Sequence, residues 1–312
     1  MELGWLEDFV TLCEVGNFSR AAEQRNLTQP AFSRHIKALE DWTGATLFDR
    51  TAQPIRPTPA GQALLPAAEG ILRRLHQARE QARAAEAGAG ATLHIAATHS
   101  LSLTFFPAWI RALEDAGRPF PIRLDSDTML ACEQALLAGQ CQFLLCHADP
   151  AEPDRLDPAH FLSVQVGTDE LVPCVAPALV DARAWLPGGA EAPTPYLAYS
   201  DASALGRAVT RRLAGLARPP HLARHFTSHL SVVLRPMVRD GKGLAWLPRS
   251  LVGDDLAAGR LAAVPGETWR IPLEVRVFRP RDRLAPAAEA FWELLAAPAA
   301  RHSEPAPALP SS

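Results

Sequence analysis

The stretch from residue 19 to residue 40 carries polar side chains at a spacing suited to reading the edges of DNA bases. Its second half predicts a helix in which Phe32, Ile36 and Leu39 form an apolar stripe at i, i+4 and i+7 spacing. The other side of this helix is polar and consists of Gln29, Ser33, Arg34, Lys37 and Glu40. Because Gln and Arg can form paired hydrogen bonds to base edges, this polar face predicts contact with the major groove.

The residues before this helix give it a defined start and a partner. Thr28 is a suitable N-cap, and Pro30 is tolerated in the first turn. Ala21 and Ala22 allow a preceding short helix to approach closely, and Leu27 is the large apolar residue of the turn. Two short helices joined in this way are typical of a helix-turn-helix. The alternative is an amphipathic helix of an ordinary bundle, but such a helix needs no exposed Gln, Ser, Arg and Lys face.

The flanking segments predict the remainder of a small DNA-binding domain. A helix is expected over residues 5–15, packed behind the helix-turn-helix. After residue 44, two short strands at 47–48 and at Ile55 predict a wing. Arg50 and Arg56 flank its turn, where they can contact phosphates or the minor groove.

A long helix is expected from residue 59 to about residue 87, followed by a glycine-rich hinge to residue 90. Its apolar seam consists of Leu64, Ala68, Ile71, Leu72, Leu75, Ala78 and Ala82. A single helix of this length with an apolar seam requires a partner. We interpret it as a dimerisation linker; the alternative is a helix packed on its own domain.

From residue 92 the sequence alternates between strand and helix patterns, which predicts a parallel sheet. Strands are expected at 93–97, 122–124, 143–146, 171–176, 196–199, 225–227, 244–247 and 273–278. Helices are expected at 107–116, 130–138, 205–216, 230–240 and 286–295. Two such α/β blocks predict two lobes with a ligand cleft between them. The tail from residue 297 is rich in Pro, Ala and Ser and is expected to be disordered.

Hydroxyl side chains mark candidate effector contacts on both lobes. Ser100, Leu101 and Ser102 follow the strand at 93–97 and precede a helix, where N–H groups and hydroxyls can bind a polar ligand. The alternative for these serines is ordinary helix capping. From the second lobe we expect three hydroxyl side chains to face them: Ser200, Ser203 and Thr227.

The amino-acid composition limits the classes of function that this chain can have. A net charge of −3 with 48% hydrophobic and 21% charged residues is typical of a globular protein, so DNA binding would require a local basic surface. The N-terminus does not resemble a signal peptide, and no run of 18 apolar residues occurs, so we expect a cytoplasmic protein without membrane contact. No Gly-x-Ser-x-Gly motif surrounds Ser100, so no catalytic residue and no enzymatic activity are expected.

Two side-chain patterns are candidates for a metal site or a redox site. His221, His225 and His229 recur every four residues, but the pattern breaks across a strand and a helix start, so no metal site and no cofactor are expected. Cys132 and Cys141 are nine residues apart and could form a redox disulfide; small buried cysteines are the favoured interpretation.

Many of these residues resemble the LysR-type transcriptional regulators, and the resemblance runs from about residue 5 to residue 295. In the N-terminal part it is carried by Phe9, Asn17-Phe18-Ser19, Ala21-Ala22, Leu27-Thr28-Gln29-Pro30-Ala31-Phe32-Ser33-Arg34, Ile36, Leu39-Glu40, Gly44, Leu47-Phe48, Arg50, Pro59 and Gly61. Three further segments resemble the hypochlorite-responsive branch of the family: residues 5–6, 97–103 and 243–248.

The resemblance implies an N-terminal all-α winged helix-turn-helix (1–58), a linker helix and hinge (59–90) and a C-terminal α/β effector domain (91–296). That domain would be two-lobed and periplasmic-binding-protein-like, with one lobe at about 91–167 and 270–296 and the other at about 168–269. The implied partners are double-stranded DNA, a small-molecule effector in the inter-lobe cleft, and further copies in a homodimer or homotetramer. By position, bases would be contacted by Gln29, Pro30, Ser33 and Arg34, and the DNA backbone by Arg50 and the wing.

The sequence departs from the family pattern at two places. Gln53 stands where the family often has a second wing arginine, a role open to Arg56. Methionine oxidation is the sensing chemistry proposed for the hypochlorite-responsive branch, yet this chain has only Met1, Met129 and Met237. A polar effector in the cleft is therefore favoured. Sensing through Met or Cys oxidation remains the alternative, and a two-lobed solute-binding protein or enzyme is a more distant one.

Overall fold

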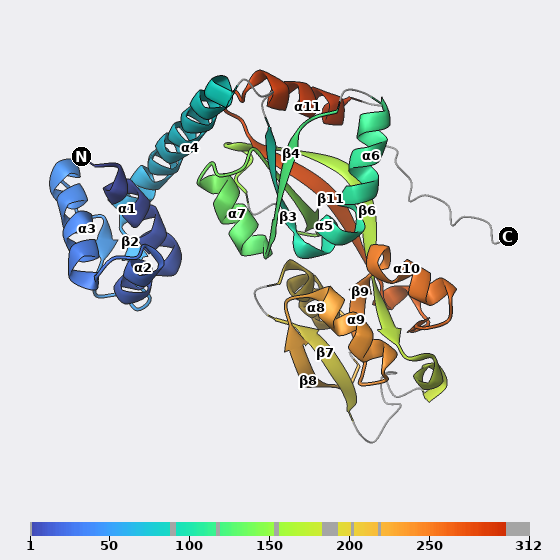
Figure 1. Cartoon of the computed structure of the whole chain (residues 1–312). Helices are drawn as coiled ribbons and strands as arrows, with labels where there is room; N and C mark the ends of the chain where they lie inside the picture. The colour runs from blue at the N-terminus through green and yellow to red at the C-terminus, as the bar shows by residue number, and fades with distance from the viewer. Residues whose placement is uncertain are drawn as a thin grey trace. The chain divides into compact units, whose positions relative to one another are not determined.

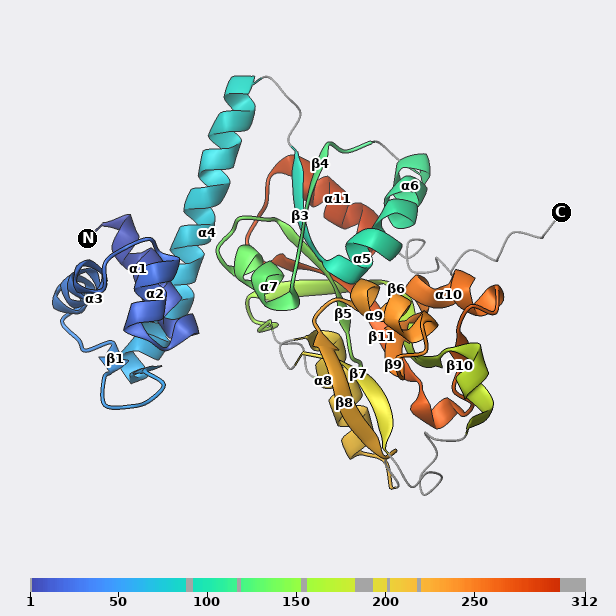
Figure 2. The ribbon, with the colours of Figure 1, turned by 60° about the horizontal axis from the view of Figure 1, so that its bottom comes forward.

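The computed structural model describes residues 2–87, 92–116, 119–152, 156–182, 193–200, 203–217 and 220–297 (Figures 1 and 2). The described residues divide into two units: an N-terminal unit of residues 2–87 with the short segment 137–140, and a larger C-terminal unit of the other residues from 92 onward. The expected hinge at 88–90 and residues 298–312 of the expected tail lie outside the described residues. None of the described helices is long and apolar enough to span a bilayer.

The N-terminal unit has the expected elements, with boundaries that differ from the expected ones by up to three residues. In order, they are α1 (Leu3–Val15), α2 (Phe18–Gln24), α3 (Gln29–Thr43), β1 (Phe48–Asp49), β2 (Arg56–Pro57) and α4 (Pro59–Ala87). α1 ends at Gly16, whose φ of 62° is readily adopted by glycine. The apolar stripe of α3 is buried against Phe9 and Leu12 of α1, so the predicted amphipathic arrangement is confirmed.

A buried carboxylate joins the helices of the N-terminal unit. Asp8 of α1 is 0% exposed and accepts a hydrogen bond from Arg25 Nε at 2.8 Å. Its second oxygen lies 2.7 Å from Nδ1 of His35 in α3. Burial alone would lower the pKa of Arg25, but its bonds to Asp8 and Glu7 raise the pKa above its usual value. The sequence analysis did not identify this network, which fixes α3 relative to α1.

The C-terminal unit is built on a mixed sheet in the order β10-β6-β11-β5-β3-β4, with β9 paired to β6. The strands are β3 (Leu93–Thr98), β4 (Ile122–Asp127), β5 (Phe143–Ala148), β6 (Phe161–Val175), β9 (Ala245–Pro248), β10 (Ala262–Ala263) and β11 (Ile271–Pro280). β3 pairs parallel with β4 and β5, whereas β11 pairs antiparallel with both β5 and β6, and β9 pairs antiparallel with β6. The prediction of a parallel sheet was therefore wrong for β9 and β11, which run against the direction of β3, β4, β5 and β6.

Helices cover this sheet, and a second, two-stranded sheet completes the unit. β7 (Thr194–Tyr199) and β8 (Leu222–Ser228) are parallel. The helices are α5 (His99–Thr104), α6 (Phe106–Ala116), α7 (Met129–Leu137), α8 (Ala204–Ala214), α9 (Ser231–Arg239), α10 (Arg249–Ala257) and α11 (Pro286–Ala296), with short 3-10 turns at Pro177–Ala182 and Glu267–Trp269. α5 and α10 were not predicted from the sequence, and only the second half of β6 was. Ser100 and Ser102 therefore lie within a helix, whereas they were expected to precede one.

Two hydrophobic cores define the two lobes of the C-terminal unit. The first is formed around Phe143 and Phe291, and the second around Trp246 and Tyr196. β6 contributes Val164 and Val166 to the first core and Leu171 and Val172 to the second; β11 likewise contributes Val275 and Val277, then Ile271 and Leu273. These two strands can be followed from one lobe into the other in Figures 1 and 2. The predicted two-lobed α/β architecture is confirmed.

Replacing Asp8 with Ala should destabilise the N-terminal unit strongly. Removal of the Asp8 carboxylate leaves Arg25 Nε and His35 Nδ1 without their shared partner, at a cost of about 1–3 kcal/mol, since the two side chains are 30% and 34% exposed. Hydrogen–deuterium exchange of the α1 and α3 amides in the intact chain measures this as faster exchange. Asp41→Ala is the matched control, because Asp41 is exposed and pairs with Lys37 at 3.6 Å. Equal exchange rates in the two variants would show that the buried pair does not hold α1 and α3 together.

Candidate functional site

The polar face of α3 is open to solvent opposite its buried stripe. Thr28, Gln29, Pro30, Arg34 and Lys37 are exposed, and Ser33 is half-buried. Thr28 is the N-cap residue, as predicted, but its side chain makes no capping hydrogen bond. The structure thus brings the six predicted α3 residues to one exposed surface, over about two and a half turns of helix.

Glu40 does not belong to this surface, although its position in the sequence placed it there. Its carboxylate accepts hydrogen bonds from the Leu47 and Phe48 N–H groups at 2.9 and 3.4 Å, and from Arg50 Nη2 at 3.0 Å. The Arg50 guanidinium also lies over the Phe18 ring, 5.3 Å from its centroid. Glu40 therefore connects the end of α3 to the start of the wing.

The two wing arginines have different surroundings. Arg50 is exposed and anchored by Glu40, whereas Arg56 is exposed on β2, opposite Asp49 in the strand pair. Both arginines line the same shallow depression on the surface of the wing. This arrangement gives a cationic wing next to the donor-rich face of α3, within one unit.

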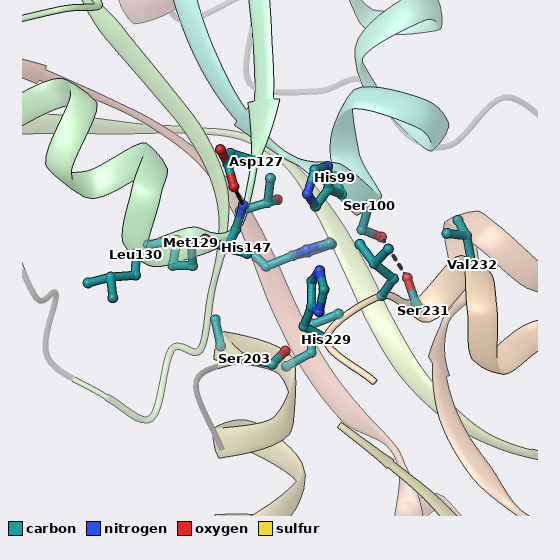
Figure 3. A pocket seen from close by; sticks show the side chains of 15 residues that line it. His99, Ser100, Asp127, Met129, Leu130, His147, Ser203, His229, Ser231 and Val232 are labelled. Atoms are coloured by element: carbon teal, nitrogen blue, oxygen red, sulfur yellow. Dashed lines mark hydrogen bonds between the residues drawn. The ribbon is translucent and has the colours of Figure 1, made fainter. Parts of the chain in front are cut away.

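A cavity of about 130 Å³ lies in the C-terminal unit at the junction of its two lobes (Figure 3). Both lobes contribute to its walls, which consist of Thr98, His99, Ser100, Asp127, Thr128, Met129, Leu130, His147, Ser203, Ala204, Leu205, His229, Leu230, Ser231 and Val232. No Lys or Arg is among these residues. The walls therefore combine apolar side chains with hydroxyls and imidazoles.

Two of the predicted effector residues line this cavity. Ser100 of α5 is 8% exposed, and its Oγ accepts a long hydrogen bond of 3.5 Å from Ser231 Oγ of the other lobe (Figure 3). Ser203 caps α8, where its Oγ accepts from the Gly206 N–H at 3.3 Å. Hydroxyls from both lobes therefore lie at this cavity, but the one that pairs with Ser100 belongs to Ser231, which was not among the predicted residues.

The other four predicted residues do not line the cavity. Leu101 is fully buried in the first core. The Ser102 hydroxyl donates to the His99 carbonyl at 3.0 Å and lies 2.7 Å from the Ser126 hydroxyl. Ser200 follows β7, and Thr227 is exposed on β8. The placement of Ser102 follows from α5 starting directly after β3, which turns Ser100 toward the cavity and Ser102 away from it.

Three histidines line the cavity, and the sequence analysis did not select them as ligands. His99 follows β3, His147 lies in β5, and His229 follows β8; the His99 and His229 ring centroids are 6.2 Å apart. Figure 3 shows the three imidazoles gathered from separate segments. Ligands bind outside the carboxyl ends of parallel strands, so the residues at the ends of β3, β4 and β5 could have been selected on that basis.

His147 is hydrogen bonded to a buried acidic side chain. Its Nε2 lies 2.9 Å from Asp169 Oδ2, and the two side chains are 4% and 3% exposed. Asp169 also accepts hydrogen bonds from the Ser250 hydroxyl at 2.7 Å and from the Ser250 and Glu170 N–H groups at 3.1 and 2.8 Å. Burial alone would raise the pKa of Asp169, but the bonds from His147 and Ser250 lower it below its usual value. Asp169 is therefore ionised at neutral pH.

The metal and redox candidates have separate locations. His225 lies in β8, which His221 and His229 flank, and no group of three metal-ligating side chains occurs in the part of the chain that the structure describes. Cys132 and Cys141 are free thiols, and burial raises their pKa values to about 11 and about 12. Such thiols are poor nucleophiles at neutral pH.

Family models match both units of the chain. The model described as bacterial regulatory helix-turn-helix protein, lysR family, matches residues 3–62. The model described as LysR substrate binding domain matches residues 86–299.

Individual proteins match nearly the whole chain. The transcriptional regulator YjiE of Escherichia coli is 31% identical over 296 residues, covering 95% of this chain and 94% of its own. The solved structure of Vibrio fischeri DarR in complex with DNA is 31% identical, with a TM-score of 0.55 and coverage of 95% and 98%. Full-length HypT from Salmonella typhimurium, described as hypochlorite-specific, is 30% identical, with a TM-score of 0.56 and coverage of 95% and 97%.

Replacing Arg34 with Ala should weaken binding to specific DNA by about 1–3 kcal/mol, if the guanidinium makes a bidentate base contact. Gel-shift titration with the DNA upstream of the protein's own gene measures this. Lys37→Ala is the matched control on the same face, because loss of a phosphate contact weakens binding to specific and random DNA alike. Unchanged affinity of the Arg34 variant for the upstream DNA would show that Arg34 does not take part in base recognition.

Proposed function

The chain belongs to the LysR family of bacterial transcription regulators, with a helix-turn-helix and an effector-binding domain, and from this premise we propose which residues read DNA and what the protein responds to. In this proposal the exposed face of α3 enters the major groove, with Gln29, Ser33 and Arg34 at base edges. Arg50 and Arg56 meet the DNA backbone or the minor groove. The observation that supports it most directly is the exposed face of α3 beside a wing arginine held by Glu40.

The proposed assembly is a homodimer paired through α4, which associates further into a homotetramer. α4 has two apolar faces: Ala68 and Leu72 are buried within the N-terminal unit, whereas Ile71 and Leu75 are 48% and 45% exposed. Large apolar side chains exposed along one helix face favour association. DNA recognition by two copies would then depend on the spacing of two half-sites.

The proposed stimulus is a small polar effector in the cavity at the junction of the two lobes. The cavity is lined by hydroxyl and imidazole groups from both lobes, and burying them against an apolar ligand would leave them unpaired at a free-energy cost. A ligand that contacts both lobes favours one arrangement of the lobes over another. This change would alter dimer spacing, and hence the DNA geometry that the regulator favours.

A second candidate function is oxidant sensing, as in the hypochlorite-responsive branch. One observation favours it: Met129 lines the same cavity, where its thioether would be accessible to a small oxidant. Met237 is partly buried against the second core. Sensing by cysteine oxidation has less support, because burial raises the pKa of every described thiol that shows a shift.

Ser100→Ala and Met129→Leu separate the two functions. If a polar effector is the stimulus, Ser100→Ala should abolish the transcriptional response while leaving DNA affinity without effector nearly unchanged. Met129→Leu should then respond normally. A reporter assay of both variants with candidate metabolites and with hypochlorite measures this. The reverse pattern, in which Met129→Leu loses the transcriptional response and Ser100→Ala keeps it, would identify oxidation as the signal.

Changing Ile71 and Leu75 together to Glu should dissociate the homo-oligomer, because it places charges on the exposed apolar face of α4. Analytical ultracentrifugation of the intact chain should show a smaller species, and Arg74→Glu on the same helix serves as the charge control. An unchanged sedimentation coefficient would mean that this face of α4 is not the pairing surface.

A further inference from the structure

The buried stripe of α3 holds this helix in the N-terminal unit but does not by itself fix its rotation. Phe32, Ile36 and Leu39 are each 0% exposed and belong to the core of this unit. The burial of apolar surface is non-directional, so it leaves the helix some freedom to turn about its axis. Hydrogen bonds to fixed partners remove that freedom, because they weaken steeply as the donor angle departs from linearity.

Two hydrogen-bonding side chains flank the stripe. At about 100° per residue, His35 and Glu40 lie on opposite sides of the stripe, each about 70° from its centre. His35 Nδ1 is 2.7 Å from Oδ2 of Asp8 in α1. Glu40 accepts hydrogen bonds from the Leu47 and Phe48 N–H groups at 2.9 and 3.4 Å. The rotation of α3 is therefore set by α1 on one side and by the start of the wing on the other.

We propose that His35 and Arg25 are positioning residues for base recognition: through Asp8 they set the rotation of α3, and hence the direction of the Arg34 side chain. The inference rests on the proposed role of Arg34 in reading DNA and adds two residues, neither of which has to contact a base. Arg34 directly precedes His35 and points about 100° away from it.

A small rotation of α3 is enough to disturb a base contact. A turn of about 10° moves a side chain at the helix surface by about 1 Å, because a helix with its side chains has a radius of about 5–6 Å. The donor–acceptor distances of N–H···O hydrogen bonds span only about 0.5 Å. Phosphate contacts tolerate such a movement better, since they depend largely on charge. Loss of the His35 anchor should therefore reduce sequence specificity more than general affinity for DNA.

Asp8 can orient His35 because Arg25 holds its carboxylate from the other side. The Asp8 side chain is 1% exposed, and its Oδ1 accepts a hydrogen bond from Arg25 Nε at 2.8 Å. The guanidinium is itself held by an ion pair between its Nη2 and Glu7. Because the carboxylate oxygens accept, the Nδ1–H of His35 is the donor, and a neutral imidazole suffices for this bond. The arrangement thus needs no change of protonation.

Arg25 also connects the turn of the helix-turn-helix to the same carboxylate. It is the C-cap residue of α2, where its N–H donates to the Ala21 carbonyl at 3.0 Å. Thr28, three residues later, is the N-cap of α3. Asp8 is therefore tied to α3 at two places: through Arg25 near the start of the helix, and through His35 in its second turn.

Gel-shift titrations of the intact chain with its upstream DNA and with random DNA of equal length test the proposal through the ratio of the two affinities. His35→Ala should lower this ratio at least about fivefold, the lower end of what one bidentate base contact contributes. Affinity for random DNA should stay within about twofold of the parent, because phosphate contacts dominate it. Arg25→Lys should also lower the ratio, since one ammonium replaces the two guanidinium nitrogens that bind Asp8 and Glu7.

His35→Asn and His35→Gln are a matched pair that separates positioning from a general effect on stability. In Asn the amide nitrogen is bonded to Cγ, as Nδ1 is in His, so it can donate to Asp8. This variant should keep the affinity ratio within about twofold of the parent, because the hydrogen bond is retained. In Gln the amide nitrogen lies one carbon further out, so His35→Gln should resemble His35→Ala. The pair provides the test if His35→Ala does not fold.

A double-mutant cycle shows whether His35 acts through Arg34. In the Arg34→Ala background, His35→Ala should lower the ratio by less than about twofold, because the side chain that it positions is already absent. Three results would each overturn the inference alone: additive losses in the cycle, an unchanged ratio in His35→Ala, or equal ratios for the Asn and Gln variants. Unchanged binding of the upstream DNA by Arg34→Ala would instead contradict the proposed readout and overturn the inference with it.

Discussion

The antiparallel pairing of β6 with β11 is the constraint on which the C-terminal unit depends. The two strands pair from Ile271 with Leu171 to Pro280 with Phe161, and each contributes side chains to both hydrophobic cores. A register shift between Val275 and Arg276 divides the ladder close to the point where one core gives way to the other. Gly167 lies at this shift, and a Cβ there would meet the Phe105 ring at 2.8 Å. The lobes are therefore joined by continuous, closely packed strands rather than by a loose linker.

This pairing also determines where the cavity forms. Strands β3, β4 and β5 end at the junction, and β6 passes beneath it with Asp169 facing β5. The first lobe provides Ser100, Asp127 and His147 from these strand ends, and the second provides Ser203 and Ser231 from the starts of α8 and α9. The site consequently requires both lobes, and its chemistry changes if either lobe is displaced.

The sequence predicted the local elements well where a strong periodic pattern existed. The α3 stripe of Phe32, Ile36 and Leu39 and the long α4 helix were identified because helical spacing alone defines them. The direction of β11 was not predictable, since strand pairing over more than 100 residues leaves no local pattern. α5 was missed because six residues are too few to show a period, and for this reason the sequence could not distinguish Ser100, which lines the cavity, from Ser102, which does not. Asp8, Glu40 and Asp169 have ordinary sequence surroundings, and partners of theirs lie 7 to 81 residues away, outside their own elements.

β6 is a single strand of 15 residues that contributes side chains to both hydrophobic cores. This limits how the length of the strand can vary among related proteins. Because side chains alternate across a strand, insertion or deletion of one residue in β6 would invert one of its halves relative to the other. Either Val164 and Val166 would then leave the first core, or Asp169 would point away from His147. β6 should therefore not tolerate insertions or deletions, whereas it should tolerate substitutions at its exposed positions. Related chains should preserve the number of residues between Val164 and Asp169 even where they preserve none of the residues themselves.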